Sequence, residues 1–330
     1  MLVTAPMNVR YLTGFESTNA AVLIEPERTR LFTDFRYAER ARAVEGVEFE
    51  ETMRYIYADL AELLPERVGI EADALTYANW ELLRQGGVDL VPRRGLVESL
   101  RVVKEPEELD AIGRATEVTN ATYERLAEEQ FALRTEKDLA WRMEQLFHEE
   151  GADGLAFPID IASGPTAASP HAVSGDRVVQ EGDLVIVDAG AIVDGYCSDC
   201  TRTFAVGEVS DSLRETYEVV RRGQQAGLDA VRAGVSGRDA DAAARAVITD
   251  AGHGENFGHG LGHGVGLLVH EAPVLRPESE DVLAVGNVVT VEPGIYLSGV
   301  AGIRIEDLVV VTEEGCDVLT TFPKDLTVVR

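Results

Sequence analysis

Residues 184–204, LVIVDAGAIVDGYCSDCTRTF, consist of two apolar runs on either side of an Asp194-Gly195 turn signal, and each run carries an aspartate. Two apolar runs joined by a short turn with glycine predict a β-hairpin. The midpoint between Asp188 and Asp199 falls at this turn. We therefore expect the two carboxylates to face each other across the hairpin, with Cβ atoms about 5 Å apart.

Residues 287–312, NVVTVEPGIYLSGVAGIRIEDLVVVT, repeat this arrangement with glutamates. Gly299 lies midway between Glu292 and Glu306, so antiparallel pairing also opposes these two side chains. Acidic residues on strands normally face solvent. Here the valine-rich and isoleucine-rich runs are apolar on both faces, which is typical of buried strands. Four buried carboxylates need cations, and two divalent metal ions would balance their charge.

A glycine-rich segment, residues 258–271 (GHGLGHGVGLLVHE), holds three of the six histidines. Glycine at every second position from 258 to 266 excludes a helix, so His259 and His263 are not the helical pair of a zinc protease. We expect the glycines to let the backbone approach a metal or substrate. One histidine among several carboxylates suits Mn²⁺, Co²⁺ or Zn²⁺ better than Mg²⁺ or Ca²⁺.

The composition indicates a globular protein of two domains. The chain has 330 residues, 45% of them hydrophobic and 27% charged,. A net charge of −28 argues against binding to nucleic acid or to an anionic membrane,. No apolar run is long enough to cross a bilayer, and the start of the chain has no signal-peptide pattern. Three cysteines are too few for a disulfide framework, so a cytoplasmic location is expected,.

A domain boundary is expected near Leu100–Glu105, which separates residues 1–103 from residues 104–330. The first part alternates short strands with helical patterns and is predicted to be a small α/β domain. Its expected strands are Ala20–Ile24, Thr29–Thr33, Arg67–Ile70 and Val88–Val91, and its expected helices are Phe35–Val44 and Tyr57–Leu64. Pro106 opens a long helix that runs to about Ala127.

The second part looks duplicated. Capping patterns at Thr135 and Ser236 each begin a helix, and each helical region precedes one of the two acid-bearing β segments,. A repeat of helix, helix, strand, strand predicts two halves around a pseudo-twofold axis. The active site is expected between them.

Motifs at these positions resemble the pita-bread metallopeptidases, in the prolidase and aminopeptidase P branch. They are Val187-Asp188-Ala189-Gly190, Cys197-Ser198-Asp199-Cys200-Thr201-Arg202-Thr203, Gly262-His263-Gly264, His270-Glu271, Glu292-Pro293-Gly294, Arg304-Ile305-Glu306-Asp307 and Pro170-His171-Ala172. Asn8–Phe15 and Thr33–Tyr37 resemble the family's N-terminal domain. The resemblance implies an α+β protein: a pita-bread catalytic domain with internal duplication, preceded by a small α/β creatinase-like domain.

The resemblance also assigns roles to individual residues. Asp188 and Asp199 would bind one metal ion, and Asp199 with Glu306 would bridge to a second ion completed by His263 and Glu292; Mn²⁺ is favoured. Glu292 would accept a proton from the attacking water, and His270 and His171 would hydrogen-bond the substrate carbonyl and the developing oxyanion. Arg304 and His259 are expected to contact substrate or to support the metal ligands.

The implied activity is hydrolysis of the Xaa-Pro bond in small peptides with proline in second position, by an Xaa-Pro dipeptidase that is a homodimer. The alternative is an aminopeptidase P that acts on longer peptides. Some relatives use an arginine just after the His-Glu-x-Pro run to hold the dipeptide carboxylate, but here Val274 follows Pro273 and the arginine is Arg276.

Two less favoured interpretations belong to other classes. One is a non-catalytic binding module on the same fold. The other is a thiol oxidoreductase that uses Cys197 and Cys200. For this cysteine pair, small buried filler is the better interpretation, because the pair lies on a predicted strand rather than at a helix start.

Overall fold

The computed structural model describes residues 1–330, which form two compact units, Met1–Arg101 and Val102–Arg330. No helix in the chain combines the length and the apolar character that a membrane span requires.

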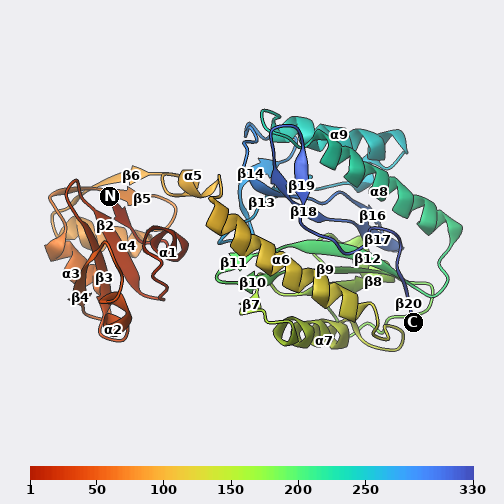
Figure 1. Cartoon of the computed structure of the whole chain (residues 1–330), viewed down its shortest axis with the longest axis horizontal. Helices are drawn as coiled ribbons and strands as arrows, with labels where there is room; N and C mark the ends of the chain where they lie inside the picture. Colours follow the sequence, from red (N-terminus) through yellow and green to blue (C-terminus); the bar gives the residue numbers. More distant parts are fainter. The chain divides into compact units, whose positions relative to one another are not determined.

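The N-terminal unit is built on one six-stranded sheet with the order β4-β3-β2-β1-β5-β6 (Figure 1). Its elements are β1 (Leu2–Val3), α1 (Pro6–Thr13), β2 (Ala20–Ile24), β3 (Thr29–Asp34), α2 (Ala38–Ala41), β4 (Glu48–Thr52), α3 (Ile56–Leu63), β5 (Arg67–Glu71), α4 (Tyr77–Gln85), β6 (Asp89–Arg93) and α5 (Glu98–Arg101). The four predicted strands are confirmed, and α3 lies where the second helix is expected.

The helix expected at Phe35–Val44 is shorter than predicted. The Asp34 carboxylate accepts a hydrogen bond from the backbone N–H of Arg36, and the Asp34 carbonyl accepts one from the N–H of Tyr37. These bonds hold the start of the segment in a turn, so that only Ala38–Ala41 is helical,.

The C-terminal unit repeats a helix pair followed by strands, in agreement with the predicted duplication. The first half contains α6 (Pro106–Leu126), α7 (Glu136–Glu149), β7 (Gly154–Leu155), β8 (Asp160–Ser163), η1 (Gly164–Ala168), β9 (Leu184–Ala189), β10 (Ala191–Val193), β11 (Tyr196–Cys197) and β12 (Cys200–Val206). The second half contains α8 (Asp211–Ala230), α9 (Gly237–Asp250), η2 (Gly254–Asn256), β13 (Gly262–Gly264), β14 (Glu271–Leu275), β15 (Val288–Val291), β16 (Gly294–Leu297), β17 (Ala301–Arg304), β18 (Asp307–Val311) and β19 (Cys316–Val318), and the chain ends with β20 (Val328–Val329).

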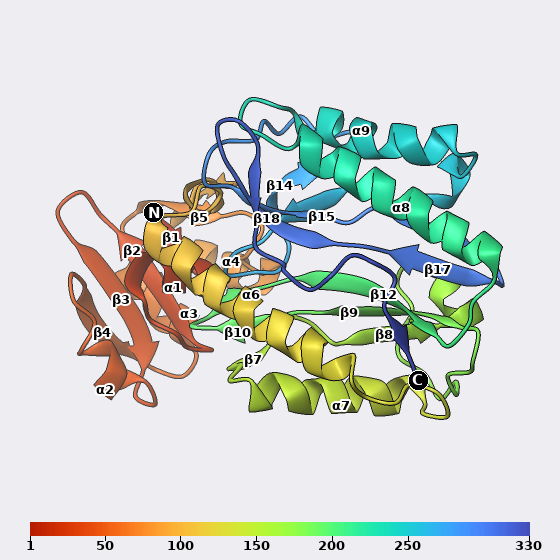
Figure 2. The ribbon, with the colours of Figure 1, turned by 45° about the vertical axis from the view of Figure 1, so that its right-hand side comes forward.

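This unit contains two main sheets, each formed chiefly by one half, and the C-terminal strand β20 joins the first. The first has the order β20-β12-β9-β8 and the second β14-β13-β15-β18-β19. Helices α8 and α9 lie side by side on one side of the strands, and α6 and α7 lie on the other (Figures 1 and 2). The two hairpins that carry the acidic residues therefore lie inside the unit, between two helical layers.

Helix starts follow the predicted capping chemistry. The Thr135 hydroxyl accepts the N–H of Asp138, and the Ser236 hydroxyl accepts the N–H of Asp239,. The long helix α6 begins at Pro106 behind Glu105 and ends one residue before the predicted Ala127.

The register of the first hairpin differs from the prediction. Asp188 lies opposite Thr201, not opposite Asp199. The hairpin turns on two residues, Asp194 and Gly195, both with positive φ (50° and 78°), and Val193 pairs with Tyr196. This turn is centred one residue later than the midpoint of the two aspartates, which shifts the partner of Asp188 by two positions.

The register of the second hairpin is as predicted. Gly294 pairs with Arg304 on one side of Glu292 and Glu306, and Val291 pairs with Asp307 on the other. The two glutamates therefore lie at corresponding positions, between the paired strands β15 and β18 and the paired strands β16 and β17.

Candidate metal centre and active site

A cavity of about 690 Å³ lies between the two halves of the C-terminal unit. The side chains around it include all nine predicted site residues: Asp188, Asp199, His263, Glu292, Glu306, His171, His259, His270 and Arg304. Residues more than 130 positions apart in the sequence thus meet at one site, where the first and second sheets face each other.

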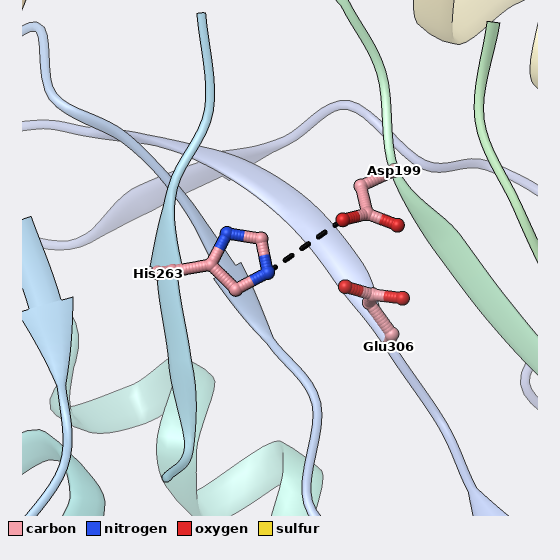
Figure 3. A group of neighbouring side chains, drawn as sticks. All are labelled: Asp199, His263 and Glu306. Atoms are coloured by element: carbon pink, nitrogen blue, oxygen red, sulfur yellow. Dashed lines mark ion pairs between the residues drawn. The ribbon is translucent and has the colours of Figure 1, made fainter. Parts of the chain in front are cut away.

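Three of the predicted ligands form a compact group. One ligand atom from each of Asp199, His263 and Glu306 lies within 4.8 Å of the others, and the three side chains converge from separate segments of the chain (Figure 3). The Nε2 atom of His263 is 3.7 Å from Oδ2 of Asp199 and 3.3 Å from Oε1 of Glu292. Three carboxylates and one imidazole nitrogen therefore surround one small volume.

The buried carboxylates at this site carry more negative charge than the neighbouring cations of the protein balance. Burial raises the pKa of Asp199 well above its ordinary value, and the charge of Asp188 raises it further. Burial also raises the pKa of Glu306, as does the charge of Asp199. Oδ1 of Asp188 is buried without any hydrogen-bond partner. An unpartnered buried carboxylate oxygen beside oxygen and imidazole donors fits a divalent cation.

His263 and Glu292 form a tightly coupled pair. Burial alone would lower the pKa of His263, but the hydrogen bond and charge of Glu292 raise it to about 9. Burial would raise the pKa of Glu292, but the interaction with His263 lowers it to about 2. Without metal the histidine therefore carries a proton and the glutamate is ionised at neutral pH.

Arg304 is the buried cation of the site. Its guanidinium donates hydrogen bonds to Asp188 Oδ2 at 2.5 Å, to Thr201 Oγ1 at 3.1 Å and to the Tyr296 hydroxyl at 2.8 Å. Thr201 in turn donates to Glu306 Oε2 at 2.8 Å. Arg304 thus orients one candidate ligand directly and a second through Thr201.

His259 lies at the end of this hydrogen-bond chain rather than beside the compact group. Its Nδ1 bonds to the carbonyl of Gly260 at 2.8 Å, which makes Nδ1 the donor, so that Nε2 accepts from the Tyr296 hydroxyl at 2.9 Å,. Burial lowers the pKa of His259, which keeps the ring neutral. Tyr296 was not among the predicted residues; its position on the strand that follows Glu292 was the only sequence signal.

The two remaining histidines are exposed at the cavity wall. The ring of His270 lies 4.3 Å from the ring of His263, and partial burial with that neighbour lowers the pKa of His270. His171 lies on the segment after η1. The buried carboxylate of Glu136 accepts hydrogen bonds from the N–H groups of Ser163 and Gly175, on either side of that segment. Glu136 was also not predicted to have a role at the site.

The two glycines beside His263 allow close packing between strands. A Cβ atom on Gly262 would lie 2.0 Å from the carbonyl oxygen of Thr290, and one on Gly264 would lie 2.3 Å from that of Ala272. These glycines let neighbouring strands of the same sheet approach, and they hold His263 in place through that packing. Gly260 and Gly262 also line the cavity, so the approach of this backbone to a metal or substrate stays a prediction.

The two cysteines of the first hairpin are buried and form no disulfide. Burial raises the pKa of Cys200, so that its thiol is not reactive at neutral pH,. This supports their interpretation as buried filler and argues against a thiol oxidoreductase.

Comparison with known proteins identifies both parts of the chain. Residues 110–313 match metallopeptidase family M24, and residues 1–103 match the creatinase/prolidase N-terminal domain. An Xaa-Pro dipeptidase of Pyrococcus furiosus is 33% identical over 99% of this chain and 94% of its own length.

Solved structures agree with these sequence matches. An Xaa-Pro dipeptidase from Bacillus anthracis is similar with a TM-score of 0.95 and 39% identity, over 99% of this chain and 94% of that one. An X-Pro aminopeptidase from Thermotoga maritima is similar with a TM-score of 0.91 and 34% identity, over 98% of this chain and 94% of that one. The chain therefore belongs to metallopeptidase family M24, in its prolidase and aminopeptidase P branch, and is a metal-dependent peptidase, as the motifs of its sequence predicted.

Proposed function

We propose that this protein hydrolyses the Xaa-Pro bond of dipeptides. The observation that carries the proposal is the convergence of all five candidate metal ligands in one cavity, in a chain that matches Xaa-Pro dipeptidases over nearly its whole length. A non-catalytic binding module on this fold would not need to retain four carboxylates at such a cost in burial.

The proposed metal centre consists of Asp188, Asp199, His263, Glu292 and Glu306, with two divalent ions. Manganese is the favoured metal, because the donor set has one imidazole nitrogen and otherwise hard carboxylate oxygens. When bound, two such ions would acidify a water molecule and polarise the substrate carbonyl.

The protein's own groups would act on protons and on the substrate. Glu292 lines the cavity, and its carboxylate can accept a proton from the attacking water,. His270 and His171 line the same cavity and would donate hydrogen bonds to the substrate carbonyl and to the oxyanion that develops there,. Arg304 and His259, joined by Tyr296, would hold Asp188 in its reactive orientation.

Arg276 favours the dipeptidase activity over aminopeptidase P. It lies two residues beyond Val274, both side chains line the cavity, and its guanidinium makes no ion pair in the protein. Arg276 directly follows β14 and lines the same cavity as Val274, so its guanidinium can bind the free carboxylate of a C-terminal proline,. The similarity to an X-Pro aminopeptidase keeps hydrolysis of longer peptides as the second candidate.

The deciding experiment compares kcat/KM for alanyl-proline and alanyl-prolyl-alanine with Mn²⁺ supplied. A dipeptidase should prefer the dipeptide, and turnover of the tripeptide alone would refute this assignment. Arg276→Gln should lower kcat/KM for alanyl-proline about 10-fold to 100-fold. The same substitution should leave kcat/KM for alanyl-prolinamide, which lacks the carboxylate, almost unchanged.

We further propose a cytoplasmic homodimer. Three cysteines that form no disulfide support a reducing compartment, and the family resemblance supports the dimer,. Light scattering on the purified protein tests the dimer, and a mass near 36 kDa would contradict it.

A further inference from the structure

Asp160 is a cavity residue to which the proposed mechanism gives no role. Strand β8 pairs antiparallel with β9 so that Asp160 lies opposite Asp188, and Asp188 lies opposite Thr201 across the next ladder. Directly opposed residues share one face of a sheet, so these three side chains form a row, of which Asp160 and Asp188 line the cavity,. The neighbouring pair, Ile161 and Val187, faces the hydrophobic core on the other side.

The Asp160 carboxylate has no partner in the protein. It is half-buried and lines the cavity, yet it makes no hydrogen bond and no ion pair anywhere in residues 1–330. The nearby guanidinium of Arg304 is already bound to Asp188, Thr201 and Tyr296. His171 is also near, but neither it nor Arg304 forms an ion pair with Asp160. A partly desolvated carboxylate without a hydrogen-bonding or ion-pair partner is unfavourable unless a ligand supplies one.

Apolar side chains surround this carboxylate. Phe157, Pro158 and Val173 line the same cavity. The Ser174 hydroxyl accepts the N–H of Ile161 at 2.8 Å and donates to the carbonyl of Ile159 at 3.2 Å, which places the segment with Val173 beside Asp160. The combination suits an aliphatic chain that ends in a positive charge.

Charges elsewhere in the cavity indicate which end of a peptide would lie here. Arg276, in the other half of the unit, is the cation proposed for the carboxylate of proline. The anionic end of a dipeptide would be repelled by Asp160, so the residue before proline would occupy the side of the cavity formed by β8.

We propose that Asp160 binds a cationic group of the residue that precedes proline. This inference rests on the proposed function and adds a substrate class to it. A basic side chain and the free α-amino group offer the same chemistry, and the apolar wall favours the basic side chain. Peptides such as lysyl-proline are then preferred over neutral peptides of the same length.

The test uses pairs of peptides that differ by one charge. In the Mn²⁺-loaded enzyme, kcat/KM for lysyl-proline should exceed that for norleucyl-proline by about tenfold or more, as expected for a charge-assisted hydrogen bond. Asp160→Asn keeps the size of the side chain and should bring the ratio close to one. Asp176→Asn is the matched control, because that carboxylate is 87% exposed and lies outside the cavity; it should keep the wild-type ratio.

A second pair tests the α-amino group as the source of the charge. If Asp160 binds that group, Asp160→Asn should instead reduce the preference for norleucyl-proline over hexanoyl-proline, which lacks the amine. If neither ratio changes in Asp160→Asn, the inference is wrong. An equal loss for every peptide together with a loss of bound Mn²⁺ also overturns it, since Asp160 would then belong to the metal centre.

Binding of single amino acids separates this inference from the proposed function. Calorimetry should give a Kd for lysine about tenfold lower than for norleucine in the Mn²⁺-loaded protein, and Asp160→Asn should abolish the difference. If no Xaa-Pro peptide is hydrolysed but this difference is present, the proposed function fails and the cation site stands. If the difference is absent while Xaa-Pro peptides are cleaved, the cation site for a side chain fails and the function stands.

Discussion

Nε2 of His263 lies 3.7 Å from Oδ2 of Asp199, and this contact joins the two halves of the duplicated unit. The histidine comes from β13 of the second half and the aspartate from the end of the first hairpin (Figure 3). Neither half holds enough ligands for the proposed centre. Metal binding and the packing of the two halves should therefore stabilise each other.

Metal binding should release protons. His263 is protonated below a pKa of about 9 in the metal-free protein, and a metal ion can bind its Nε2 only after that proton leaves,. The apparent affinity for Mn²⁺ should therefore rise as pH increases from 6 toward 9. Calorimetric titration in two buffers of different ionisation enthalpy measures the protons released. Mn²⁺ binding at pH 7 without proton release would contradict the assignment of His263 as a ligand.

Gly262 should be intolerant of any side chain. A Cβ atom there would lie 2.0 Å from the carbonyl oxygen of Thr290. This oxygen belongs to the backbone of the paired strand β15, so moving it would require a large free energy. We expect Gly262→Ala to lower the free energy of unfolding by about 3 kcal/mol and to weaken Mn²⁺ binding through His263. Urea unfolding and metal analysis measure the two effects.

Gly258→Ala is the control for this substitution, because a Cβ on Gly258 would meet nothing within 4 Å. It belongs to the same glycine-rich segment and should be nearly neutral. Equal effects of the two substitutions would show that the segment needs flexibility rather than close packing at one position.

The site could be predicted from the sequence where the chain itself sets the geometry. Gly299 forms the turn of the second hairpin, so the correspondence of Glu292 and Glu306 follows from counting outward on both sides. The same counting was wrong at Asp188 because the turn is centred between Asp194 and Gly195, one residue beyond the assumed centre.

Other parts of the site depend on tertiary contacts that no local pattern encodes. Tyr296 matters because its hydroxyl meets Arg304 and His259, and Glu136 matters because its carboxylate meets both flanks of the segment that carries His171. Both residues look like ordinary members of a strand and a helix in the sequence. Their partners lie between 8 and 39 positions away, at distances that only the folded chain defines.

Arg304→Lys should reduce activity more than it reduces metal content. Lysine keeps the positive charge, but it cannot reproduce the planar set of donors that reaches Asp188, Thr201 and Tyr296 together,. We expect kcat/KM for alanyl-proline to fall about 10-fold to 100-fold. Tyr296→Phe, which removes only the hydroxyl, should give a smaller decrease. An Arg304→Lys enzyme with wild-type kcat/KM would show that the guanidinium geometry is dispensable.

Glu136→Gln should loosen the segment that carries His171. Oε1 of Glu136 accepts hydrogen bonds from the Ser163 N–H at 2.8 Å and hydroxyl at 2.7 Å, and Oε2 accepts the Gly175 N–H at 3.0 Å. Glutamine places its NH₂ group, a donor, against one of the donors of Ser163 or Gly175. This should lower the free energy of unfolding by about 1–3 kcal/mol. Hydrogen exchange should become faster in residues 164–175, and kcat should fall.

Glu144→Gln on the same helix is the comparison for Glu136→Gln, since the Glu144 carboxylate makes no hydrogen bond. Hydrogen exchange in residues 164–175 should match the wild type in this variant. Unchanged exchange in both variants would mean that Glu136 does not hold the segment.

Acid should destabilise the N-terminal unit through Asp34. Its buried carboxylate accepts hydrogen bonds from Arg36 Nε at 2.8 Å and from Arg36 Nη2 at 2.7 Å, and Asn19 Nδ2 donates to it at 2.5 Å, so the pKa of Asp34 lies well below its ordinary value. A lowered folded-state pKa stabilises the fold above the unfolded pKa of about 4, and this stabilisation is lost as pH falls from about 4 through the folded pKa. Asp34→Asn should lower the free energy of unfolding by about 1–2 kcal/mol at pH 7 and make its dependence on acid pH shallower.

The N-terminal unit can be followed by its own fluorescence. In a Trp141→Phe background, Trp80 is the remaining tryptophan, and its fluorescence during urea unfolding reports on this unit alone. The same slope of stability against pH below pH 4 in both proteins would rule out Asp34 as the titrating group.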